Sequence, residues 1–136
     1  MLVDELAKMA KDLKKAIDND DLDKVEEITA IQPMLISDFR SELYLPAAKC
    51  NNVKILKIIM EGANQEIKDL SLIEAISHDK VENAKFLIDN GAKSIEKALI
   101  IGVSNNNSRL VELLLDKGAD PNFNNAAALF EAVKKG

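Results

Sequence analysis

Cys50, His78 and Asn105 are the residue types of a thiol-protease active site, and they occur in that order along the chain. Each lies three residues after a small residue of a repeating pattern described below. Equivalent positions of adjacent packed helices are about 8–10 Å apart, whereas a nucleophile and its base must approach to about 3 Å. We therefore expect no catalysis from these residues, and interpret them as part of an exposed binding row.

Metal chemistry finds no better support. The run from Asp18 to Asp23 resembles a calcium loop, but Leu22 interrupts its ligands and it lacks the glycine that such a loop needs for its sharp turn. A helical turn with Asp side chains as N-caps explains this run better. The chain holds one Cys and one His, so no zinc-type cluster can form. We expect neither a metal nor a cofactor.

A repeated pattern positions these residues. Small residues recur at intervals of 31, 28, 27 and 30 positions, and we call them the anchors: Ala16, Ala47, Ala75, Gly102 and Ala132. An Asp, Asn or Gly stands four residues after each anchor, at Asp20, Asn51, Asp79, Asn106 and Gly136. These three types tolerate a left-handed backbone best. The pattern predicts a tight turn of that conformation in every unit.

Each unit reads as a pair of helices. Between Leu72 and Gly91, apolar residues recur every three or four positions on both sides of Asp79, which indicates helices and not strands. Nine and twelve residues past the anchors, the second helices carry apolar residues, and seven past they carry a charge. Gly62, Gly91 and Gly118 are predicted to end three second helices as left-handed caps. Pro33 is predicted to end the first.

The segments Gly62-Ala63-Asn64, Gly91-Ala92-Lys93 and Gly118-Ala119-Asp120-Pro121-Asn122, each after an apolar run, resemble ankyrin repeats. The resemblance covers about residues 13–136 and implies an all-α solenoid of stacked helix-turn-helix repeats. Ankyrin units usually carry Thr-Pro-Leu-His at the start of the first helix, and no copy occurs here. Its His column instead reads Lys14, Leu45, Ile73, Ile100 and Phe130. The short linkers predict that the β-hairpin fingers of the family are shortened or absent.

We expect a single ankyrin-repeat domain over residues 1–136. Residues 1–12 extend the first helix as an N-terminal cap, and repeats follow at about 13–40, 41–68, 69–95 and 96–125. Residues 126–136 form a partial repeat. We expect a monomer, with self-association open through the uncovered side of that partial repeat.

The resemblance implies a non-catalytic scaffold that binds another protein through the concave face of its inner, first helices. The alternative is a regulatory inhibitor that covers the surface of a partner enzyme. We place Phe39 and Tyr44 in the long second linker. They either bind the partner as exposed aromatic residues or pack beneath this linker. The predicted partner-binding residues are Asn19, Lys49, Cys50, Ser77, His78, Ser104, Asn105, Lys134 and Lys135.

Composition restricts the classes of partner and the cellular compartments that we expect for this chain. The net charge of −5 and the isoelectric point near 4.9 argue against nucleic-acid and anionic-membrane binding. A single cysteine excludes an internal disulfide. The first residues, Met1-Leu2-Val3-Asp4-Glu5, lack the basic and apolar run of a secretory signal. We expect a cytoplasmic or otherwise intracellular protein, with delivery into a host cell left open.

Overall fold

The computed structural model describes residues 2–120 and 122, which form helices joined by short turns and loops, with no strand among them. The chain divides into two compact units, Met1–Ala63 and Asn64–Gly136. The first unit contains α1 (Val3–Asp18), α2 (Leu22–Ile31), α3 (Leu35–Ala48) and α4 (Val53–Met60). The second contains α5 (Gln65–Ser77), α6 (Val81–Asp89), α7 (Ile95–Ser104) and α8 (Ser108–Asp116). The partial repeat predicted at 126–136 lies outside the described residues.

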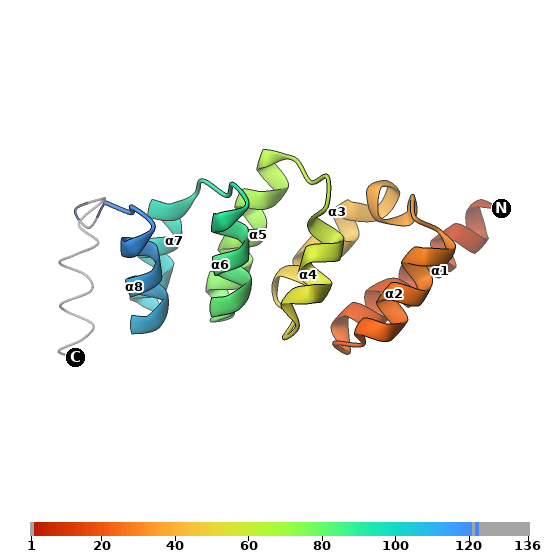
Figure 1. The fold of residues 1–136 in the computed structure, drawn as a ribbon, viewed down its shortest axis with the longest axis horizontal. Coiled ribbons are helices and arrows are strands. Elements are labelled where there is room, and N and C mark those ends of the chain that lie inside the picture. The colour runs from red at the N-terminus through yellow and green to blue at the C-terminus, as the bar shows by residue number, and fades with distance from the viewer. Residues whose placement is uncertain (1, 121, 123–136) are drawn as a thin grey trace. The chain divides into compact units, whose positions relative to one another are not determined.

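Each unit stacks two helix pairs (Figure 1). In the first unit α1 packs against its own partner α2 and against α3, while α2 also contacts α4. The second unit repeats this plan, with α5 between α6 and α7, and with α6 also contacting α8. First helices therefore pack on first helices and second helices on second helices. This confirms the predicted all-α, helix-turn-helix repeat architecture.

The buried residues follow the predicted columns. The four anchors within the described residues are all buried, as is every residue nine or twelve positions beyond them. The charged column of the second helices is fully on the surface: Asp23, Lys54, Glu82 and Arg109. Small anchors let the two helices of a pair approach closely, while the branched side chains of the second helix fill the space between pairs. Helical periodicity alone was enough to predict this core.

Three of the four predicted turns that can be checked have a left-handed residue. Asp20, Asp79 and Asn106 have φ values of 55°, 58° and 54°. The fourth prediction is wrong, because Asn51 is not among the residues with positive φ. Helix α3 ends at Ala48, one residue earlier relative to its anchor than the other first helices do. The turn before α4 is therefore one residue longer, and it reverses the chain without a left-handed residue.

The ends of the second helices also follow the sequence. Gly62, Gly91 and Gly118 adopt φ values of 78°, 104° and 98°, which confirms their predicted role as left-handed caps. Helix α2 ends at Ile31, two residues before Pro33, as expected. At the other end, Asp21, Asn52 and Asn107 accept hydrogen bonds from the first turns of α2, α4 and α8. The Asp18–Asp23 run thus contains a helix cap, as predicted.

Within the part of the chain that the structure describes, the segments between repeats contain no hairpin finger. Residues 32–34, 61–64 and 90–94 connect the pairs as short loops, so the prediction of missing fingers is confirmed. The expected repeat starts at residues 41 and 69 fall inside α3 and α5, because these helices already begin at Leu35 and Gln65. Phe39 and Tyr44 were expected in a linker, but both lie half-buried within α3, and Phe39 forms a kink there (φ −120°).

Gly102 is the only glycine among the described anchors, and it occupies an ordinary helical position. A Cβ atom there would lie 3.5 Å from Val111 Cγ2 and 3.8 Å from Leu114 Cδ1, both normal contact distances. We predict that Gly102→Ala raises the free energy of unfolding by about 0.5–1 kcal/mol, because Ala is favoured over Gly inside a helix. Urea unfolding followed by circular dichroism measures this, and a destabilised variant would show that the α7–α8 contact is tighter than described.

Candidate functional site

In each unit the two first helices have an exposed side, and we call this side the first-helix face of that unit. It comprises the residues five and two positions before each anchor and two positions after it. In the first unit these residues are mostly charged: Lys11, Lys14, Asp18, Glu42, Leu45 and Lys49. In the second unit they are mostly apolar or small: Leu70, Ile73, Ser77, Lys97, Ile100 and Ser104. The two units therefore offer surfaces of different chemistry.

The predicted binding row lies at the edge of this face. Six of its members are on the surface: Asn19, Lys49, Ser77, His78, Ser104 and Asn105. Lys134 and Lys135 lie outside the described residues. Within the second unit, Ser77 and Ser104 follow each other on the adjacent helices α5 and α7. Among the described members of the row, all but one are therefore on the surface.

Cys50 is the exception, and its predicted place on the surface is wrong. Only 6% of the residue is exposed, and its Sγ donates a hydrogen bond to the Asn52 carbonyl at 3.2 Å. The early end of α3 turns this residue inward, and an apolar thiol gains from burial. A buried, hydrogen-bonded thiol is a poor nucleophile.

Side chains of the row in the second unit are partly engaged by the protein itself. The hydroxyls of Ser77 and Ser104 donate to the carbonyls of Ile73 (2.8 Å) and Ile100 (3.0 Å) of their own helices. His78 Nε2 lies 3.7 Å from Glu74 Oε1. The hydroxyl oxygens of Ser77 and Ser104 can still accept hydrogen bonds. Because each hydroxyl is already held by its own helix, it would offer a ligand an acceptor of fixed orientation. Among the described residues, no group of His, Cys, Asp and Glu could hold a metal ion.

The left-handed aspartates have a second role that the sequence did not reveal. Asp20 accepts hydrogen bonds from the backbone N–H of Asn51 (2.7 Å) and from its side-chain amide (3.0 Å). In the second unit, Asp79 accepts from the side chain of Asn107 at 2.9 Å. Glycine would suit the backbone equally well but could not accept these bonds. Aspartate therefore ties the turn of one repeat to the turn of the next.

Helical turns at the starts of α3 and α5 take the place of the fingers. Arg40 of α3 donates to the carbonyls of Ile59 (3.3 Å) and Glu61 (2.6 Å), at the end of α4. In the second unit, the carboxylate of Asp69 accepts from the N–H of Lys93 at 2.7 Å. These side chains satisfy backbone groups at the end of α4 and in the loop before α7. Their partners lie 19 to 24 residues away, too far for local pattern reading.

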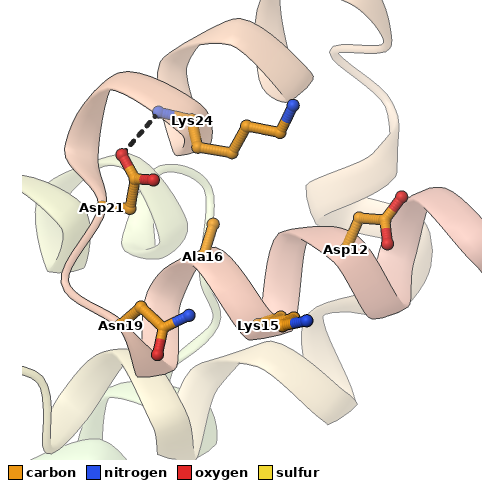
Figure 2. A pocket seen from close by; sticks show the side chains of 6 residues that line it. All are labelled: Asp12, Lys15, Ala16, Asn19, Asp21 and Lys24. Atoms are coloured by element: carbon orange, nitrogen blue, oxygen red, sulfur yellow. Dashed lines mark hydrogen bonds between the residues drawn. The ribbon is translucent and has the colours of Figure 1, made fainter.

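A pocket of about 400 Å³ opens between α1 and α2 (Figure 2). Its lining is Asp12, Lys15, Ala16, Asn19, Asp21 and Lys24. The residues 31 positions further on in the second repeat are Leu43, Pro46, Ala47, Cys50, Asn52 and Ile55, and all but Asn52 are buried. The positions that are buried in the second repeat are therefore occupied mostly by charged residues in the first repeat. A polar outer side of this kind is what a terminal repeat needs, while the expected cap over residues 1–12 stays a prediction.

Asp89 at the end of α6 is linked to Lys117 at the end of α8. The hydrogen bond from Lys117 holds the pKa of the Asp89 carboxyl below its ordinary 3.8, with the charges of Lys117 and Lys85 acting in the same sense and desolvation opposing them. A lowered folded-state pKa means that the contact stabilises the fold above the ordinary value. This contribution is lost as the pH falls through the lowered pKa.

We therefore predict that Asp89→Asn slightly lowers the melting temperature at neutral pH and has a smaller effect below the carboxyl pKa. Thermal unfolding across this pH range measures the difference. The effect is small because both side chains are partly solvated. A difference that stays constant with pH would contradict the assignment.

No helix within the described part of the chain has both the length and the apolar character required to cross a bilayer. A family model described as ankyrin repeats in three copies matches residues 43–125, which is more than half of the chain. Comparison with curated proteins and with solved structures gave no match. Ankyrin repeats are generally protein–protein interaction modules. The match and the stacked helix pairs agree, and the chain belongs to the ankyrin repeat family.

Proposed function

We propose that this chain is a non-catalytic binding module that holds another protein on its first-helix face. The observation that carries the proposal is the apolar centre of that face in the second unit. Leu70 is 43% exposed, and Ile73 and Ile100 are partly exposed beside it on α5 and α7. Family membership supports a protein as the partner, and the net charge of −5 argues against nucleic acid.

The chemistry of the face favours a partner with aliphatic side chains. Ile73 and Ile100 occupy the column in which the family usually carries histidine. Apolar area removed from water contributes about 25 cal/mol per Å². Ser77 and Ser104 border this centre, and an apolar core with a polar rim is the usual anatomy of a protein interface. We assign most of the binding free energy to this unit.

The first unit would contribute orientation more than affinity. Its face places Lys14 and Lys49 near Asp18 and Glu42 around the single apolar Leu45, which is 38% exposed. Exposed charges of mixed sign mainly steer association and discriminate between partners. The row residues Asn19, His78 and Asn105 add hydrogen-bonding groups at the edge. An aliphatic segment of a partner would suit the face of the second unit, and a segment of mixed charge would suit that of the first.

Affinity capture with the tagged full chain tests the proposal. The double variant Leu70→Lys/Ile73→Lys should weaken binding of the captured protein at least tenfold, because loss of a central apolar contact typically costs about 2 kcal/mol or more. The matched control is Arg109→Glu, a charge change in the exposed column of the second helices. Circular dichroism verifies that all variants fold. Binding that survives the double variant but is lost in Arg109→Glu would overturn the proposed face.

A further inference from the structure

We propose that Asn90–Gly91 is a site of spontaneous deamidation, and that the contact of Gln65 with this loop sets its rate. Asn90 is the only asparagine of the chain that is followed by glycine. Both residues are exposed, directly after the last turn of α6. This proposal is independent of the binding face.

The reaction needs only water and the chain itself. The backbone nitrogen of Gly91 loses its proton to hydroxide and attacks Asn90 Cγ. A bond forms between this nitrogen and Cγ. The Cγ–Nδ2 bond then breaks as the leaving nitrogen takes a proton from water, which releases ammonia and regenerates the hydroxide. Water then opens the resulting succinimide at either carbonyl, giving aspartate or isoaspartate. Glycine favours the attack because it has no side chain to hinder the approach of its nitrogen.

The folded structure holds both reacting groups in hydrogen bonds. The N–H of Gly91 donates to the Ile88 carbonyl at 3.1 Å, and the Asn90 side-chain amide donates to the Phe86 carbonyl at 2.8 Å. Deamidation therefore requires the last turn of α6 to open. Helix ends open at low cost compared with the core. The fraction of time spent open controls the rate.

Contacts from the start of α5 limit this opening. Gln65 Nε2 donates to the Gly91 carbonyl at 2.8 Å and also to Asp69 Oδ1 at 2.9 Å. The same Asp69 oxygen accepts from the N–H of Lys93 at 2.7 Å. One side chain of α5 thus holds Gly91 directly and supports the group that holds Lys93. Removing it frees the backbone on the glycine side of the reacting bond.

Conversion would change the end of α6 in two ways. A new carboxylate would stand beside Asp89 at a helix C-terminus, where negative charge is unfavourable. Isoaspartate also lengthens the main chain by one carbon, which displaces the cap formed by the Ala92 N–H and the Leu87 carbonyl (2.9 Å). The modified chain should therefore lose its ordered loop at residues 90–94.

Peptide mapping by mass spectrometry tests the proposal on the folded full chain, incubated in mildly alkaline and in mildly acidic buffer. We expect Asn90 to convert faster than any other asparagine, and faster in the alkaline buffer. Gln65→Ala should raise the rate at Asn90 roughly two- to tenfold, the effect of losing a typical hydrogen bond. Ser94→Ala, which removes the bond from Ser94 Oγ to the Asp69 carbonyl, should raise it to a smaller extent.

Two controls make the outcome decisive. Glu66→Ala, an exposed neighbour of Gln65, should leave the rate unchanged, and Asn90→Gln should abolish the converted peptide. Absence of conversion in the folded chain, under conditions in which the urea-unfolded chain converts, would overturn the site. Equal rates in the wild type, Gln65→Ala and Ser94→Ala would overturn the role of α5.

Discussion

Leu72→Ala is expected to lower the free energy of unfolding by about 2–5 kcal/mol. Leu72 lies on α5 and is fully buried, three residues before the anchor Ala75. Its side chain belongs to the buried core of the second unit, in which α5 contacts α6 and α7. Truncation leaves a cavity that the small neighbouring anchors cannot fill, because the helix backbones are already close. Urea unfolding followed by circular dichroism measures the change.

Leu70→Ala on the same helix is the matched control. The substitution is chemically identical, but Leu70 is 43% exposed on the first-helix face. We expect it to cost well under half as much stability, because much of its apolar area is already in water. Equal losses for the two variants would mean that α5 is rotated about its axis relative to the orientation described.

Asp79→Val is expected to cost about 2–4 kcal/mol, from two separate causes. Asp79 has a φ of 58°, a conformation that is strained by about 1–3 kcal/mol for a residue unsuited to it, and β-branched residues are the least suited. The variant also loses the acceptor of the hydrogen bond from Asn107, which is 2.9 Å long. Such a bond contributes about 0.5–1.5 kcal/mol.

Asp79→Gly separates these two causes. Glycine adopts the left-handed conformation freely, so this variant should lose only the bond to Asn107 and cost about 1 kcal/mol. Chemical denaturation of both variants gives the comparison. If Asp79→Gly is as destabilising as Asp79→Val, the hydrogen bond and not the backbone conformation governs this turn.

Features of the fold could be predicted from the sequence where a local backbone conformation or a buried position restricts the residue types that fit. We could predict the glycines that end second helices, and the Asp or Asn of the tight turns, because few residue types tolerate positive φ. The buried positions could be predicted because the spacing of the apolar residues matches the period of a helix. The alternation of first and second helices then followed from the spacing of the anchors. These features comprise most of the fold within the described residues.

The failures share a different cause. Nothing near Asn51 in sequence shows that α3 ends one residue early, so both the left-handed turn and the exposure of Cys50 were wrongly expected. The early starts of α3 and α5 depend on contacts such as Asp69 with Lys93, between residues far apart in the chain. For the candidate site, the apolar residues Ile73 and Ile100 were noticed as a departure from the family. Their place on the exposed face required the structure.

Helical turns stand where ankyrin repeats usually have a hairpin finger, and we therefore propose that the first-helix face binds the partner. Backbone chemical shifts of the full chain in solution test this most directly. We predict helical shifts from Gln65 to Asp69, continuous with the rest of α5, and helical shifts from Leu35 to Asp38, up to the kink at Phe39. Extended shifts in these segments, with cross-strand contacts between their backbones, would restore the finger and contradict the account.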